Sequence, residues 1–170
     1  MPTYDFIVIG SGIAGLSYTV KVAQYFEDQN VPVKIALITK TIAEETNTKY
    51  AQGGIAAVWD SDDSFDKHIQ DTLVAGDFIS DPEVVEMVVR EAPERLRELI
   101  AYGTDFDRKA DGTFDLVKEG GHSDKRILHY KDSTGNEIER ALLAKVKSFK
   151  SVDFFTHYFA VDLITQHHLG

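Results

Sequence analysis

The sequence predicts an α/β fold in which parallel strands alternate with helices. A short apolar run over residues 4–9 is followed at once by the glycine-rich stretch GSGIAG. Apolar residues then recur at helical spacing, and after the break DQNVP a second apolar run covers residues 33–39. Strand, tight turn, helix and strand in this order form a βαβ unit, and its crossover connection makes the two strands parallel.

The composition limits the classes of protein to which the chain can belong. Its 170 residues are about the length of one domain, and 43% hydrophobic residues are typical of a soluble globular protein. A net charge of −10 argues against nucleic acid as a partner, because phosphate backbones require clustered cations. The absence of cysteine excludes disulfides and thiolate metal sites and fits a cytoplasmic location. No apolar run reaches the roughly 18–20 residues that cross a bilayer, so we expect no membrane partner.

The strands and the helix of the βαβ unit have local causes. Residues 4–9 (YDFIVI) and 33–39 (VKIALIT) are short, apolar and rich in β-branched or aromatic side chains, which predicts two buried strands. A helix is expected between them, over residues 13–25. Its buried face is predicted to consist of four apolar residues at helical spacing, Ile13, Leu16, Val20 and Ala23.

Capping signals predict two further helices. Ser64 can cap a helix that runs to Gly76. Ser80 or Asp81 can cap the next helix, with Pro82 at or near its first position.

The remaining elements follow from breakers and apolar runs. Pro93 is expected to break or kink the second of these helices into two, because proline removes a backbone donor. Residues 41–62 carry no clear period. Later expected elements are strands in ADGTFDLV and RILHY, a helix over 135–149, and strands over 152–158 and 160–165.

The stretch from Gly10 to Gly15 has the pattern GxGxxG between a strand and a helix, which is the context of a dinucleotide-binding loop. Gly10 permits the tight turn, Gly12 lets the backbone approach a pyrophosphate, and Gly15 lets the helix pack against the strand. The helix N-terminus offers unpaired N–H groups to the phosphates. The alternative is a glycine-rich turn without a ligand.

The acid expected at the end of the second strand, where it would bind the ribose hydroxyls, is missing. The strand ends in Lys40, and the nearest acids are Glu44 and Glu45. Lys40 can face the adenosine end of a dinucleotide, and a lysine there also suits a 2′-phosphate, which leaves NADP open. A solvated charge at the end of the strand is the alternative for Lys40.

Four blocks in a fixed order identify a resemblance: GSGIAGLS, TNTKYAQGGIAAV, DTLVAG and EGGHSDKRILH. From residue 4 to residue 165 the chain resembles the N-terminal part of the L-aspartate oxidase family, within the succinate dehydrogenase and fumarate reductase flavoprotein superfamily. The resemblance implies a Rossmann-like FAD-binding fold with a parallel sheet. Residues 1–170 are then an incomplete FAD-binding domain, and the capping domain and C-terminal parts are absent.

The resemblance also implies where FAD lies. Ser11, Gly12, Ile13 and Ala14 match the family's pyrophosphate contacts, and Lys40 matches a position near the adenosine ribose. The segment that wraps the flavin is then Asn47, Thr48, Lys49, Tyr50, Ala51, Gln52, Gly53 and Gly54.

Within this segment, Gly53 and Gly54 carry no Cβ, so their backbone can lie against the flat ring system. Asn47 stands where covalently flavinylated relatives carry histidine, so non-covalent FAD is expected. Tyr50 is expected to fill the core rather than pack on the flavin. Gln52 can bond the flavin or tie down its own loop.

The chemistry implied by the resemblance is oxidation of L-aspartate to iminoaspartate by hydride transfer to FAD, with O2 or fumarate as oxidant. The product enters NAD biosynthesis, with quinolinate synthase as a candidate partner. Glu119 matches the carboxylate that orients the substrate, while the catalytic arginine lies beyond residue 170. The 170-residue chain alone is therefore expected to be inactive and to bind FAD weakly or not at all.

His122, Arg126 and His129 share the segment of Glu119. They are either neighbours of the flavin or substrate, or residues that hold a loop by hydrogen bonds to backbone. The acids Asp60, Asp62 and Asp63 are expected to be a solvated charge run. No histidine pair has convincing metal-ligand spacing, so no metal site is expected.

Two other functions remain open at this point. One is a soluble flavoprotein of the fumarate reductase type, which Glu119 and Asn47 disfavour. The other is a stand-alone nucleotide-binding module. If strands expected to pair with later segments are left open, their edges favour association with other chains, so a homo-oligomer or capture of a partner at that edge is expected.

Overall fold

The computed structural model describes residues 2–169, which divide into two compact units. Unit 1 contains the chain up to Lys49 and again from Glu139 onwards. Unit 2 is the continuous segment Tyr50–Ile138. The chain therefore passes between the units twice, and each unit has its own core.

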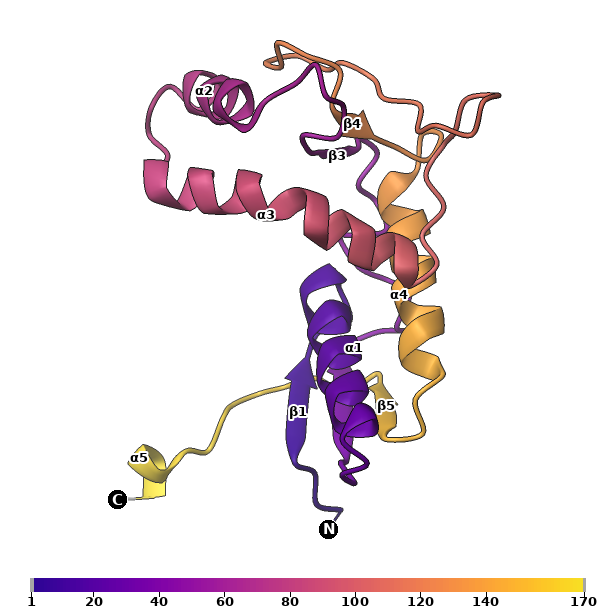
Figure 1. Ribbon diagram of the computed structural model, residues 1–170. Helices are drawn as coiled ribbons and strands as arrows, with labels where there is room; N and C mark the ends of the chain where they lie inside the picture. The colour runs from indigo at the N-terminus through magenta and orange to yellow at the C-terminus, as the bar shows by residue number, and fades with distance from the viewer. Residues whose placement is uncertain (1, 170) are drawn as a thin grey trace. The chain divides into compact units, whose positions relative to one another are not determined.

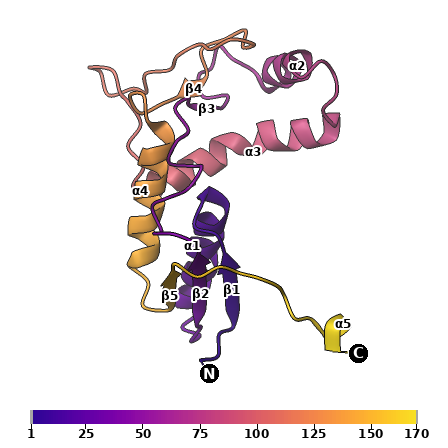
Figure 2. The ribbon, with the colours of Figure 1, turned by 180° about the vertical axis from the view of Figure 1, so that it is seen from behind.

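Unit 1 is built on a three-stranded parallel sheet with the strand order β1-β2-β5 (Figures 1 and 2). Its strands are β1 (Phe6–Ile9), β2 (Ile35–Thr39) and β5 (Val152–Thr156), and the helix α1 (Ile13–Asp28) connects β1 to β2. Both strand pairs are parallel. The predicted βαβ unit and parallel sheet are confirmed.

The two predicted strands of the βαβ unit differ in burial. β2 is buried along nearly its whole length, as expected. In β1 only Val8 is buried, whereas Ile7 and Ile9 are 62% and 51% exposed. The expectation of a buried β1 is wrong because β1 is an edge strand of the described sheet, and little of the described chain covers the side chains of Ile7 and Ile9.

The helix α1 uses most of its predicted face. Leu16, Val20 and Ala23 are buried, and Thr19 joins them. Ile13, expected on the same face, is exposed, because it lies in the first turn of the helix.

Unit 2 contains the two helices that the capping signals predicted. The helix α2 (Phe65–Ala75) begins after Ser64, whose side chain accepts a hydrogen bond from the Lys67 amide. The helix α3 (Pro82–Ala101) begins after Asp81, whose carboxylate accepts from the amides of Glu83 and Val84. Both caps satisfy backbone donors that a helix leaves unpaired at its start.

Pro93 does not divide α3, contrary to expectation. The helix runs without interruption from Pro82 to Ala101 (Figure 1). One apolar stripe continues through the proline, formed by the buried residues Val85, Val89, Pro93, Leu96 and Leu99. Burial of this stripe outweighs the cost of the lost backbone hydrogen bond, because packing of an amphipathic face supplies most of the stability of a helix in a protein.

The strands of unit 2 are short. The antiparallel pair β3 (Ile55–Ala56) and β4 (Ile127–Leu128) forms a two-stranded sheet. β4 lies in the predicted RILHY strand, while β3 lies in the stretch without a clear period. The strand expected in ADGTFDLV is reduced to isolated bridges, one from Phe114 to Arg108 and one from Val117 to Ile127. Elements of two residues are too short to show an apolar period.

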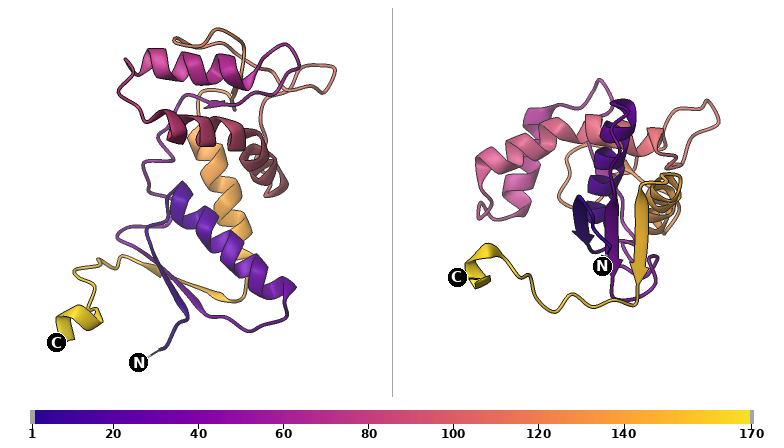
Figure 3. Two further views of the ribbon diagram at one scale, coloured as in Figure 1. Left: turned by 60° about the vertical axis from the view of Figure 1, so that its left-hand side comes forward. Right: turned by 90° about the horizontal axis from the view of Figure 1, so that it is seen from below.

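The C-terminal part is only partly as predicted. The helix α4 (Thr134–Lys147) and the strand β5 match the expected elements. The strand expected over 160–165 is absent, and this segment is exposed. Figure 3 shows it leaving β5 as an extended chain, followed by the short α5 (Gln166–Leu169). Alternating apolar residues form a strand only when a partner strand satisfies their backbone. Within residues 2–169, no helix is long and apolar enough to cross a membrane.

The close contact between Gly15 and the preceding loop gives a test of this fold. A Cβ at Gly15 would lie 2.0 Å from the carbonyl oxygen of Gly10. We expect Gly15→Ala to lower the free energy of unfolding by about 3 kcal/mol, because backbone must move apart. Gly120→Ala is the matched control, since nothing lies within 4 Å of its Cβ position. Equal urea midpoints for the two variants would contradict the prediction.

Candidate functional site

The GxGxxG loop of unit 1 has the geometry that its glycines predict. Gly10 has a φ of +104°, which favours glycine, and its amide donates to the carbonyl of Ile38 at 2.8 Å. Gly15 lies so close to the Gly10 carbonyl that no side chain fits. The loop therefore makes a tight turn after β1 and brings the start of α1 against it, as in dinucleotide-binding folds.

The N-terminus of α1 has no cap from its own N-cap residue. Gly12 offers no side chain, and the Ile13 amide donates instead to Oγ1 of Thr48 at 3.0 Å. The fold thus joins two segments that were predicted separately as cofactor-binding. One backbone donor of the first turn is thus satisfied by an oxygen acceptor from outside the helix.

Other residues of the loop point elsewhere. Ser11 is buried, and its hydroxyl donates to Oγ1 of Thr39 at 3.2 Å, so only its backbone remains for a ligand. Ala14 is exposed on the first turn of α1, and Lys40 is exposed where β2 ends. Lys40 stands at the carboxyl end of a parallel strand, the edge at which open α/β sheets bind ligands.

The segment that carries Asn47 and Thr48 is held by α4. The Thr46 hydroxyl donates to Oε2 of Glu139, and the Lys49 amide donates to Thr46 Oγ1 at 3.3 Å. Glu139 is buried, and burial raises the pKa of its carboxyl group. Asn47 itself is exposed and lies between Thr46 and Thr48, which both make hydrogen bonds within unit 1.

In unit 2 the two adjacent glycines have different surroundings. A Cβ at Gly54 would lie 2.3 Å from Cγ2 of Ile127 and 2.4 Å from the carbonyl oxygen of Leu128. A Cβ at Gly53 would only touch the Glu119 carboxylate, at 3.8 Å. Gly54 is therefore required by the packing of β4, a reason that the sequence did not suggest. Gly53 is exposed and leaves its backbone open.

The other predicted flavin contacts in unit 2 lie close to Gly53 in the chain. Tyr50 is 63% exposed, so the expectation that it fills the core is wrong. The carbonyl of Ala51 accepts from the Gly135 amide at 2.9 Å, which fixes the start of the segment. Gln52 is exposed.

Glu119 stands at the start of a turn, with its carboxylate beside Gly53. The His122 amide donates to the Glu119 carbonyl at 3.3 Å, and Gly121 has a φ of +84°. Lys118 closes the turn by donating to the carbonyl of Ser123 at 2.9 Å. The side chain of Glu119 is exposed.

The strongest electrostatic feature of unit 2 is the guanidinium of Arg126, which is 0% exposed. It donates twice to Asp63, both at 2.8 Å, and once to Asp71 at 2.5 Å. It also lies 3.2 Å from Nδ1 of His122. Arginine has donors only, so His122 accepts at Nδ1.

This cluster corrects one prediction and reveals a residue that the sequence analysis missed. The Asp63 side chain is only 3% exposed, so Asp63 does not belong to a solvated charge run, although Asp60 and Asp62 are exposed. Asp71 was not singled out, yet it binds both Arg126 and Ser123. The sequence signal that could have pointed to a buried acid was Arg126, because a cation next to a buried apolar strand requires an acidic partner.

The pKa values in the cluster follow from these bonds. Burial acts to raise the pKa of Asp71, but hydrogen bonds from Ser123 and Arg126 lower it to about 2. Burial also acts to raise the pKa of Asp63, but the hydrogen bond from Arg126 outweighs this effect, so the pKa is lowered. Burial lowers the pKa of the adjacent His68, with Arg126 and His122 contributing, so this ring is neutral at pH 7.

His129 is separate from the cluster. Its Nδ1 lies 3.3 Å from Asp107, and the Asp107 amide donates to the His129 carbonyl at 2.8 Å. His129 and Asp107 thereby join two loop segments. Across the described chain, no group of three or more histidine and acidic residues has the arrangement of a metal site.

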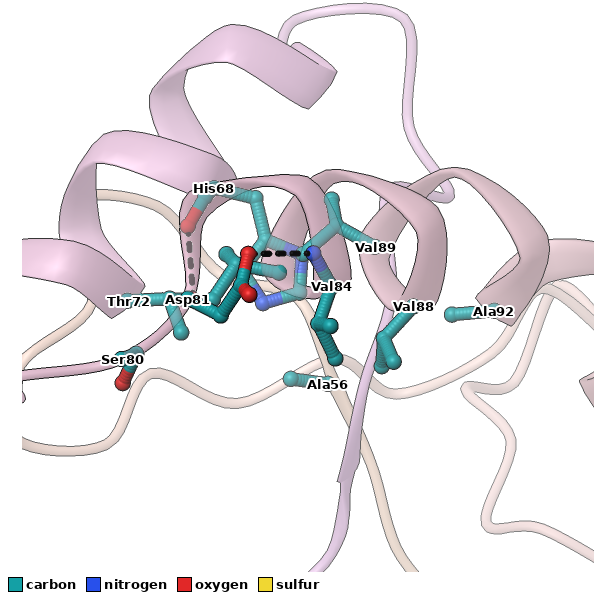
Figure 4. Close-up of a pocket in the computed structure, with 10 residues that line it drawn as sticks. Ala56, His68, Thr72, Ser80, Asp81, Val84, Val88, Val89 and Ala92 are labelled. Carbon is teal, nitrogen blue, oxygen red and sulfur yellow. Dashed lines mark hydrogen bonds between the residues drawn. The ribbon is translucent and has the colours of Figure 1, made fainter.

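A cavity of about 430 Å³ lies between α2 and α3 within unit 2. Figure 4 shows its apolar wall, with Val84, Val88 and Ala92 from α3. Two of the polar residues that Figure 4 draws there are engaged: Asp81 caps α3, and the Thr72 hydroxyl donates to the His68 carbonyl at 2.8 Å, whereas the buried Nδ1 of His68 has no hydrogen-bond partner.

A glycine loop of this geometry between parallel strands defines a dinucleotide-binding α/β protein. Comparison with known families makes this specific: a family model described as FAD binding domain matches residues 5–168, and the chain belongs to that family. The residues present fit FAD, since the glycine loop makes a tight turn at the start of α1, where Gly12 carries no capping side chain. FAD, and not NADP, is therefore the cofactor.

Relatives with known names agree with this assignment. The chain is 49% identical over 162 residues to the chloroplastic L-aspartate oxidase of Oryza sativa, covering 95% of the chain and 24% of the relative. It is 51% identical to L-aspartate oxidase 2-b of Nicotiana tabacum, with the same coverage. It is 40% identical to the L-aspartate oxidase of Vibrio cholerae, covering 98% of the chain and 31% of the relative. The chain thus spans about a quarter to a third of the length of these relatives.

Solved structures with a similar fold are flavoprotein oxidoreductases. Quinol fumarate reductase of E. coli matches with a TM-score of 0.83 and 31% identity, over 94% of this chain and 26% of that one. The Sdh1 complex of Mycobacterium smegmatis matches with a TM-score of 0.79 and 33% identity, over 91% and 27%. The Rossmann-like FAD-binding fold predicted from the sequence is confirmed.

The low pKa of Asp71 predicts a specific loss of stability in acid. Its pKa of about 2 in the folded chain is below the ordinary value of 3.8, so Asp71 stabilises the fold above about pH 4. This contribution is lost as the pH falls towards 2. We expect Asp71→Asn to lower the free energy of unfolding at pH 7 by about 1–3 kcal/mol, with the difference from wild type shrinking between pH 4 and pH 2.

Urea unfolding at a series of pH values measures this difference. Asp124→Asn is the control, because Asp124 pairs with the partly exposed Lys67 at 2.9 Å, and such pairs contribute little. A difference for Asp71→Asn that stays constant down to pH 2 would show that the Asp71 charge is not the cause.

Proposed function

We propose that residues 1–170 are the N-terminal FAD-binding part of an L-aspartate oxidase, which oxidises L-aspartate to iminoaspartate at the start of NAD biosynthesis. The proposal rests above all on one observation: the exposed Glu119 carboxylate lies beside the open backbone of Gly53, in a chain 49–51% identical to plant L-aspartate oxidases. The capping domain and the catalytic arginine then belong to the part of the enzyme beyond residue 170.

In this proposal unit 1 supplies the part of the cofactor site that holds the pyrophosphate. The glycine loop of unit 1 and the first turn of α1 hold the pyrophosphate by backbone N–H groups. Thr48 and Asn47 lie at that helix end and along the flavin, and Lys40 lies near the adenosine ribose. Because an asparagine cannot form the covalent bond that a histidine forms in some flavoproteins, FAD is bound non-covalently.

Bound FAD would accept the hydride from the substrate Cα and pass the electrons to O2 or fumarate. The chain's own contribution to the substrate is Glu119. A carboxylate facing the ammonium group of aspartate holds the substrate in one orientation and discriminates it from succinate, which has no amine. Its exposure leaves it available for this ion pair.

A soluble flavoprotein of the fumarate reductase type is the second candidate. The fold similarity to quinol fumarate reductase, with a TM-score of 0.83, supports it. The lower sequence identity of 31%, against 49–51% for the plant L-aspartate oxidases, places it second.

The proposal extends to the location and the partners of the protein. A cytoplasmic location fits the absence of cysteine, although the plant relatives are named chloroplastic. Quinolinate synthase is a candidate partner, because it would consume the product. The outer strands β1 and β5 are edges of the described sheet, which supports pairing between copies of the chain.

Replacement of Glu119 tests the proposed role in the complete enzyme that contains this segment. We expect Glu119→Gln to lower kcat/KM for aspartate about 10- to 100-fold, as for loss of a charged hydrogen bond. Fumarate reduction should change much less, because fumarate has no ammonium group. Steady-state kinetics with both substrates measure the two effects, and equal losses would count against the assignment.

The isolated chain gives a second test. We expect the purified 170-residue chain to have no aspartate oxidase activity and to bind FAD weakly or not at all, because it spans about a quarter of the plant enzymes' length. The absorbance spectrum of the purified chain and an aspartate turnover assay with added FAD measure both properties. Turnover by this chain would overturn the division of the site proposed above.

A further inference from the structure

We infer that Asp71 and Arg126 position Glu119 for substrate binding, and that they do so through Ser123. The inference rests on the proposed function. It assigns a role in substrate recognition to a buried cluster that does not itself reach the substrate.

The Glu119 carboxylate is held in place through the main chain of its turn. Among the residues that the structure describes, no hydrogen bond to this carboxylate is found, and a Cβ added at its neighbour Gly53 would lie 3.8 Å from it, at ordinary van der Waals distance. The position of the carboxylate is therefore set by the main chain of its turn. That turn contains Gly120 and Gly121, which restrain the backbone less than other residues do.

Ser123, at the end of the turn, is bonded to Asp71. The amide and the hydroxyl of Ser123 both donate to the same oxygen of Asp71, at 2.7 Å and 2.8 Å. Asp71 belongs to α2, which is distant in sequence from the turn. These two bonds fix Ser123 to α2, and the exposed Lys67–Asp124 pair joins the next residue to the same helix.

Asp71 is itself held in place by Arg126. Arg126 donates to that same oxygen of Asp71 at 2.5 Å and is oriented by its bidentate pair with Asp63. Bidentate pairs of this kind fix the plane of a guanidinium. Arg126 also contacts Nδ1 of His122, so the cluster holds the turn at two consecutive residues, His122 and Ser123.

These contacts form one path from α2 through Ser123 to the main chain of Glu119. Weakening the path lets the turn move while the fold of unit 2 persists, because Ser123 is exposed and contributes little to the core. The expected consequence is a carboxylate that occupies several positions and binds the ammonium of aspartate less well.

Kinetics of the complete enzyme with bound FAD test the inference. We expect Ser123→Ala to raise KM for aspartate about threefold and Asp71→Asn about tenfold, with the flavin spectrum and FAD content unchanged. Asp124→Asn, in the same loop but paired with Lys67, should stay within twofold of wild type.

Double variants separate positioning from a general structural effect. In the Glu119→Gln background, Asp71→Asn should add less than a twofold change, because both substitutions remove the same interaction. Effects that multiply in the double variant, or a KM unchanged in Asp71→Asn, would overturn the inference. A wild-type enzyme that does not oxidise aspartate would instead overturn the proposed function on which it rests.

Discussion

A fully buried guanidinium is the constraint around which unit 2 is organised. An arginine cannot lose its charge, so Arg126 is stable in the interior only if acids and acceptors surround it. The fold supplies Asp63 before α2, Asp71 within α2 and His122 from the Glu119 turn. Arg126 stands directly before β4, so the same residue also ties these segments to the short sheet.

The position of Arg126 and β4 also affects the two adjacent glycines from which a flavin site was inferred. β4 follows Arg126, and its residues Ile127 and Leu128 lie so close to Gly54 that no side chain fits there. Gly53, one residue earlier, has space and an exposed backbone beside Glu119. Of two adjacent glycines, one is thus explained by internal packing and the other by an open surface, and the open one is the better candidate for close approach to a ligand.

In unit 1 the main constraint is different: the backbone N–H groups at the start of α1 need acceptors. Gly12 cannot cap the helix, and Thr48 from the connection after β2 supplies the acceptor. Glu139 on α4 in turn holds Thr46, two residues before Thr48. The glycine loop and the segment with Asn47 are therefore parts of one arrangement within unit 1, although more than 30 residues separate Ile13 from Thr48 in the sequence.

The sequence by itself determined the features that depend on neighbouring residues. Helical spacing located α1, side-chain caps located α2 and α3, and the pattern of Gly10, Gly12 and Gly15 located the tight glycine loop, because these signals act within a few residues. Only the tertiary structure decided the exposure of Ile7 and Ile9, the continuity of α3 through Pro93 and the missing strand over 160–165. It also paired Arg126 with Asp63 and Asp71, which are 63 and 55 residues away. Burial and ion pairing depend on segments brought together by the whole fold, and local spacing carries no information about those partners.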